Sequence, residues 1–186
     1  MATKAIVKIR AVSNTGPLLS AFQCGRVDIL KHFHEAIYIT PDQVAELREH
    51  GAGEEVDELV KEGFLVVVGL SEDEEREALK VAEMIAGLAR NKDPKAHLPE
   101  AKAMVLMMRG DLEARYILLE ERSARTVAAQ LGLEYTGFVG ILILAAQQGL
   151  ISPDELKEAL EICRRSGTFY SQELINEAVK KARSEH

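Results

Sequence analysis

The chain has 186 residues, 47% of them hydrophobic and 28% charged, which is enough apolar material for a folded core and argues against disorder. Its 30 acidic and 23 basic residues leave a net charge of −7. A broad basic surface that coats nucleic acid is therefore not expected, although a local basic strip is compatible with this composition. The two cysteines, Cys24 and Cys163, form no CxxC pair, and such sparse usage is typical of the reducing cytoplasm.

Strand-like apolar segments alternate with helical patterns in the first half of the chain. Strands are predicted at residues 5–12, 36–40 and 65–70. Residues 65–70 are uniformly apolar, as in a strand covered on both faces. Helices are predicted at residues 17–25, 26–33, 41–51, 53–63 and 71–90. Thr15 or Gly16 is expected to cap the first of these helices.

The same alternation continues in the second half. Residues 91–97 are expected to form a loop, because they carry a proline and several charges. Strands are then predicted at residues 115–119 and 133–136. Helices are predicted at residues 99–110, 123–132, 137–149, 153–166 and 171–184. The uncharged stretch 135–153 has an apolar centre too short for a membrane span, so we expect a buried helix and no membrane partner.

This order of elements predicts an α/β fold. Alternating strands and helices indicate a central, mainly parallel sheet of about five strands in a three-layer α/β/α sandwich. The length predicts one domain over residues 1–186, with residues 152–186 as a C-terminal helical extension. No signal peptide is expected at the N-terminus.

Oxygen-bearing side chains gather near the predicted ends of the strands. Asn14 follows the first strand, and Glu46 lies in the helix after the second. Glu100 lies in the first turn of the helix before the fourth strand, which Glu120 and Glu121 follow directly. Side chains at the carboxyl ends of parallel strands can share one cleft. Mg²⁺ and Mn²⁺ prefer such oxygen ligands, although a single glutamate on a helix is far more often a solvated surface residue.

Several motifs resemble those of PIN-domain proteins, in a VapC-like prokaryotic branch. VSNTGPLL with RVDIL resembles the opening of that branch, and ITPDQVAEL resembles its proline-led helix with a glutamate. LPEAKAMVLM resembles its third motif, and ILLEERSARTVAAQLGLEYTGFVGILILAAQQGLI is the most extended match. The motifs stand in the family's order and extend over roughly residues 7–175.

The resemblance implies a PIN-like α/β/α sandwich and a ribonuclease that depends on Mg²⁺ or Mn²⁺. It implies Glu46, Glu100, Glu120 and Glu121 as catalytic residues, with either member of the 120–121 pair facing the metal. The same four side chains and Asn14 would be metal ligands. Substrate contacts would come from Thr15, Arg122 and Arg125.

Three positions depart from the family pattern. Asn14 stands where the family has an aspartate, Pro99 where it more often has glycine, and Phe138 where it often has threonine. A neutral Asn14 should weaken binding of a divalent cation. Two hypotheses therefore stand: a ribonuclease that cleaves phosphodiesters with metal-activated water, or a catalytically weakened PIN-fold protein that acts as a binding module.

The resemblance also implies partners. RNA is the expected substrate, and many prokaryotic relatives are toxins bound by an antitoxin protein. The terminal helices carry apolar residues at helical spacing, such as Leu156, Leu160 and Cys163. Packing within the chain is the default explanation, and an exposed remainder would suit a homodimer or an antitoxin helix.

Overall fold

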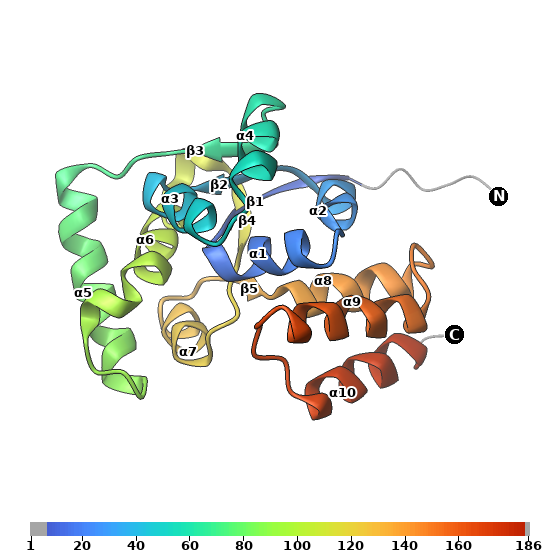
Figure 1. Ribbon diagram of the computed structural model, residues 1–186. Helices are drawn as coiled ribbons and strands as arrows, with labels where there is room; N and C mark the ends of the chain where they lie inside the picture. Colours follow the sequence, from blue (N-terminus) through green and yellow to red (C-terminus); the bar gives the residue numbers. More distant parts are fainter. Residues whose placement is uncertain (1–6, 185–186) are drawn as a thin grey trace.

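The computed structural model describes residues 7–184 and places five parallel strands at the centre of the molecule (Figure 1). The strands are β1 (Ile9–Ser13), β2 (His34–Ile39), β3 (Leu65–Val67), β4 (Ala114–Leu118) and β5 (Tyr135–Thr136). Their order in the sheet is β3-β2-β1-β4-β5, and every neighbouring pair is parallel. Residues 5 and 6 of the predicted first strand lie outside the described residues.

Helices cover both faces of this sheet. They are α1 (Thr15–Gln23), α2 (Val27–Phe33), α3 (Pro41–Glu49), α4 (Gly53–Lys61), α5 (Glu72–Leu88), α6 (Leu98–Met107), α7 (Arg122–Gln130), α8 (Phe138–Gln147), α9 (Pro153–Arg165) and α10 (Gln172–Arg183). Side chains alternate across the strands, so Ile37 and Ile39 join one core cluster and Tyr38 joins the other. The first cluster packs under α1–α4 and α8–α10, and the second under α5–α7. The predicted three-layer α/β/α sandwich is confirmed.

The C-terminal helices extend the larger of the two layers. Leu156, Leu160 and Cys163 of α9 are fully buried, and the Cys163 thiol donates to the Ser20 carbonyl oxygen at 3.2 Å. α10 packs on α8 and α9 (Figure 1). The apolar stripes of these helices are thus used inside the chain. Within residues 7–184 no helix combines the length and the apolar character needed to cross a membrane.

Three local predictions were wrong. β3 is an edge strand that ends at Val67, whose side chain is 40% exposed, so it is not covered on both faces. Residues Pro94–His97 form a 3-10 helix within the predicted loop, because the Asp93 side chain caps it and His97 is buried. The N-cap of α1 is Asn14 and not Thr15 or Gly16. The Asn14 side chain makes no capping hydrogen bond, which leaves it available for contacts outside the helix.

Candidate functional site

The candidate site lies at the carboxyl ends of β1 and β4. The chain runs from β1 outward to β2 and β3 and then returns to form β4 on the other side of β1. In open α/β sheets a crevice forms where the winding direction reverses in this way. The backbone N–H of Asn14 donates to the Leu118 carbonyl oxygen at 3.2 Å. The segments that follow β1 and β4 therefore leave the sheet side by side.

Asn14 and Glu100 are hydrogen-bonded to each other in this crevice. Asn14 Nδ2 donates to Glu100 Oε1 at 3.2 Å, and Asn14 is only 5% exposed. The other oxygen of each side chain, Asn14 Oδ1 and Glu100 Oε2, is buried without a hydrogen-bond partner. Burial raises the pKa of Glu100, and the charges of Glu121 and Glu46 raise it further. Two hydrogen-bonded side chains therefore each keep one buried oxygen without a partner, and their surroundings disfavour the negative charge of Glu100.

Glu46 approaches the same place from α3. The Thr15 hydroxyl donates to Glu46 Oε2 at 2.5 Å, so the residue after Asn14 fixes this carboxylate. Gln43 of the same helix is fully buried, and its Nε2 donates to the Pro99 carbonyl oxygen at 3.2 Å. Gln43 also completes the capping box of α3 with Thr40. One side chain thus ties the start of α3 to the start of α6, which carries Glu100.

Glu120 and Glu121 point to different partners. Glu120 Oε1 accepts a hydrogen bond from the Tyr170 hydroxyl, which lies 2.9 Å from Ser20 Oγ. Burial raises the pKa of Glu120, while the Tyr170 hydrogen bond and the Arg125 charge oppose that rise. Glu121 is the N-cap of α7 and accepts from the Ser123 and Ala124 amides at 3.1 and 2.6 Å.

Both members of this pair border the crevice. A Cβ built on Gly16 would lie 3.5 Å from Glu120 Oε2 and 3.9 Å from Asn14 Oδ1, so these two oxygens flank the same point. The charge of Glu121 acts instead on Glu100. Glu120 thus lies near Asn14, and Glu121 acts on Glu100.

A comparison of the chain with models of known protein families agrees with these residues and with this topology. A family model described as a PIN domain matches residues 10–184, almost the whole chain. The chain belongs to the PIN-domain family. Comparisons with curated proteins and with solved structures returned no match. PIN domains have a nuclease-type fold and generally depend on divalent metal ions, so the chemistry of the crevice can be compared with that expectation.

The side chains at this crevice of the PIN domain carry the kind of donor atom that a hard divalent cation binds. Asn14 Oδ1 and Glu100 Oε2 are buried and unpaired, and all the side chains that converge here offer oxygen, the donor that Mg²⁺ and Mn²⁺ prefer. No salt bridge within residues 7–184 joins Glu46, Glu100, Glu120 or Glu121 to a basic side chain. In the same part of the chain no three His, Cys, Asp or Glu side chains lie close enough to form a ready-made metal site. Three of the carboxylates have their own hydrogen-bond donors: Thr15 for Glu46, Tyr170 for Glu120 and the α7 amides for Glu121.

The two arginines of the PIN motif occupy different environments. Arg122 is exposed at the start of α7 and lines a hollow of about 610 Å³ with Arg90 and Glu121. Arg125 is held against the backbone instead, since its Nε donates to the Leu119 carbonyl oxygen at 2.8 Å. A Cβ at position 137 would lie 2.2 Å from Arg125 Nη2, so Gly137 permits this close approach.

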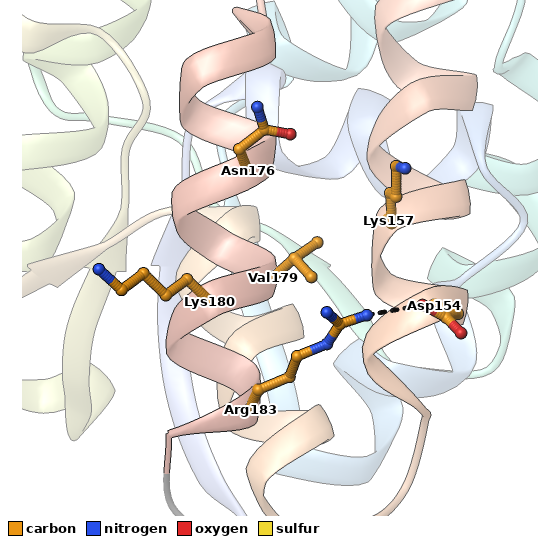
Figure 2. Close-up of a pocket in the computed structure, with 6 residues that line it drawn as sticks. All are labelled: Asp154, Lys157, Asn176, Val179, Lys180 and Arg183. Carbon is orange, nitrogen blue, oxygen red and sulfur yellow. Dashed lines mark hydrogen bonds and ion pairs between the residues drawn. The ribbon is translucent and has the colours of Figure 1, made fainter.

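A separate hollow lies between α9 and α10 (Figure 2). It measures about 390 Å³ and is lined by Lys157, Lys180 and Arg183 together with Asp154. Arg183 Nη2 and Asp154 Oδ1 are 3.1 Å apart, and both side chains are well exposed. None of the residues predicted for the site lines this hollow, so the acidic crevice is the candidate site.

Sequence reasoning missed three residues that organise the crevice: Gln43, Ser20 and Tyr170. Gln43 is visible in the sequence as the partner of Thr40 in a capping box, but its bond to Pro99 spans 56 residues. Ser20 and Tyr170 are separated by 150 residues. No local pattern could have linked either pair.

Proposed function

We propose that the protein is a PIN-type endoribonuclease that uses Mg²⁺ or Mn²⁺ to cleave RNA phosphodiesters. The observation that carries this proposal is the pair of buried, unpartnered oxygens, Asn14 Oδ1 and Glu100 Oε2, among carboxylates that form no salt bridge within residues 7–184. Burying such groups without compensation is costly. A bound cation offsets that cost, which explains why the crevice retains them.

In this proposal Asn14, Glu46, Glu100 and one or both of Glu120 and Glu121 hold the ion. When bound, the ion lowers the pKa of a coordinated water and neutralises charge on the phosphate oxygens. Thr15 orients Glu46 through its 2.5 Å hydrogen bond, and Tyr170 orients Glu120. The α7 amides fix Glu121.

Contact with RNA in this proposal is local. The net charge of −7 disfavours a broad nucleic-acid surface. Arg122 and Arg90 line one hollow beside Glu121, where they can contact phosphates next to the scissile one. The family relationship supports a role as the toxin of a toxin–antitoxin pair, with an antitoxin protein as a partner and a homodimer as a further assembly.

Cleavage of a labelled RNA with Mn²⁺ tests the enzyme proposal. Glu46→Gln should lower the rate by about 100-fold or more, because a neutral side chain replaces a proposed ligand. Glu49→Gln is the matched control, since Glu49 is exposed on the same helix, and it should retain the wild-type rate. Equal rates for the wild type and Glu46→Gln would overturn the proposal.

A second candidate function is supported by Asn14 and by the lack of a ready-made metal site in residues 7–184. A neutral ligand weakens cation binding, so the chain could act as a weakened PIN-fold binding module. RNA binding without Mn²⁺-dependent cleavage, together with no effect of Mn²⁺ on thermal unfolding, would favour this function.

A further inference from the structure

A small hollow adjoins the acidic crevice on the side of the C-terminal helices. It measures about 270 Å³ and is formed by the segment between α9 and α10 against the start of α7 and of α8. Glu120, Glu121 and Arg125 provide its polar side. Figure 1 shows the connection between α9 and α10 lying near α7. Glu120 and Glu121 are also among the proposed ligands of the ion, so the hollow lies directly beside the proposed site.

The other side of this hollow is apolar. Val139, Phe169 and Leu174 line it, and the Phe169 side chain is fully exposed. Single exposed apolar residues are common on protein surfaces, so exposure alone carries no argument. What distinguishes Phe169 is that it lines a hollow whose other side carries the partly buried carboxylates of Glu120 and Glu121.

The segment that carries Phe169 is firmly attached on both sides. The Thr168 hydroxyl donates to Gln23 Oε1 at 2.7 Å, and the Thr168 amide donates to the Cys163 carbonyl oxygen at 3.0 Å. Tyr170 is buried and is hydrogen-bonded to Glu120 and Ser20. The backbone at Phe169 therefore lies between two anchored residues, and its ring is exposed.

We propose that this hollow binds an unpaired nucleobase of the RNA, stacked on Phe169, next to the phosphodiester held at the crevice. Aromatic side chains bind bases of single-stranded RNA by stacking, while glutamate and arginine can contact base edges and phosphates. The hollow is smaller than the roughly 300–1,000 Å³ of sites for drug-sized ligands, so it suits one ring better than a peptide helix. The inference rests on the proposed function and adds to it a site on this chain for one base of the RNA.

The chain has no tryptophan, so Phe169→Trp creates a single fluorescent reporter in the hollow. We expect a short single-stranded oligoribonucleotide to quench this fluorescence saturably in EDTA, where metal-dependent cleavage does not occur. A duplex of the same length should quench it much less, because its bases are already stacked. Leu150→Trp is the control: Leu150 is 39% exposed and follows the far end of α8, and its fluorescence should not respond.

A second variant measures the same contact in the reaction. Phe169→Ala should raise KM for single-stranded RNA by about tenfold, since stacking on one aromatic ring is lost. With an RNA that lacks the base at the stacked position, the wild type and Phe169→Ala should have the same KM. The fold should survive, because Phe169 packs little surface in the interior.

The outcomes separate this inference from the proposed function. Quenching of Phe169→Trp by RNA without cleavage by the wild type would refute the nuclease and keep the base site. Cleavage without quenching, or equal quenching by the duplex, would overturn the base site and keep the nuclease. A fluorescence shift with an amphipathic leucine-rich peptide, but none with RNA, would assign the hollow to a protein and also overturn the inference.

Discussion

Charged side chains are arranged differently at the amino ends of the sheet strands, called here the amino edge, and at their carboxyl ends, the carboxyl edge. At the amino ends of the strands Arg10 lies 3.4 Å from Glu35 and 3.2 Å from Glu113, so opposite charges are paired in solvent. At the carboxyl ends Asn14 and Glu100 share a buried space, and each retains an unpartnered oxygen. At the amino edge the opposite charges balance each other, so no bound ion is needed to neutralise them. At the carboxyl edge burial and the charges of Glu121 and Glu46 raise the pKa of Glu100, so a bound cation, as proposed above, would stabilise its charged form.

Buried polar groups differ between the edges in the same way. His34, at the amino end of β2, is buried and satisfied, since Nδ1 lies 2.8 Å from the Leu30 carbonyl oxygen and Nε2 lies 2.7 Å from the Tyr116 hydroxyl. Burial lowers the pKa of His34 and raises the pKa of Tyr116 to about 12, so both stay neutral near pH 7. The amino edge buries neutral groups, whereas the acidic side chains at the carboxyl edge are partly buried.

Removing the charge of Glu100 should have the largest effect on the difference between the two edges. Glu100→Gln eliminates a buried carboxylate, and its amide can donate to Asn14 Oδ1, so the metal-free protein should gain on the order of 1 kcal/mol at pH 7. Mn²⁺-dependent cleavage should fall by about 100-fold or more. Urea unfolding in EDTA and a cleavage assay measure the two effects. Glu83→Gln, at an exposed position on α5, is the control; a metal-free Glu100→Gln less stable than the wild type would contradict this account.

Adding a negative charge at position 14 should increase the difference in charge between the two edges. Asn14→Asp places a second carboxylate beside Glu100 and removes the donor at 3.2 Å. The metal-free protein should be less stable, while Mn²⁺ should bind about tenfold more tightly because a charged ligand replaces a neutral one. Calorimetric titration with Mn²⁺ measures this change, with Asn176→Asp on α10 as the control. If affinity does not rise, residue 14 does not face the cation.

The amino edge should respond to pH through His34. Because the folded pKa of His34 is lowered, its stabilising contribution is complete above the unfolded pKa of about 6.5 and is lost as the pH falls through the folded pKa. The raised pKa values of Glu100 and Glu120 act oppositely, favouring the folded state as the pH falls. The difference in unfolding free energy between the wild type and His34→Gln should therefore shrink from pH 7 to pH 5. His50→Gln, at an exposed position, should show no such trend.

Arg10→Ala should have the smallest effect. The ion pairs of Arg10 are exposed, and such pairs contribute little to stability and are screened by salt. The midpoint of thermal unfolding should barely change at physiological salt. A large loss of stability would show that charge pairing at the amino edge supports the fold, and the proposed difference between the two edges would then weaken.

Most of the fold could be predicted from the sequence, because its signals are local. Apolar periodicity and turn residues placed the parallel sheet, the flanking helices and the order of the motifs. The errors came where burial depends on neighbours: β3 lies at the sheet edge, and His97 is buried in a 3-10 helix. The sequence by itself also determined which oxygen-bearing residues follow the strands, and the resemblance of its motifs to the PIN family implied an aspartate where this chain has Asn14.

Only the tertiary structure decided how those residues are held. Tyr170 and Ser20 meet Glu120 across the fold, and Gln43 ties α3 to α6. The structure also separated Arg122, which is exposed, from Arg125, which is bound to the Leu119 carbonyl. These contacts join segments far apart in the chain, and side-chain burial and hydrogen bonding at such distances follow from packing and not from local pattern.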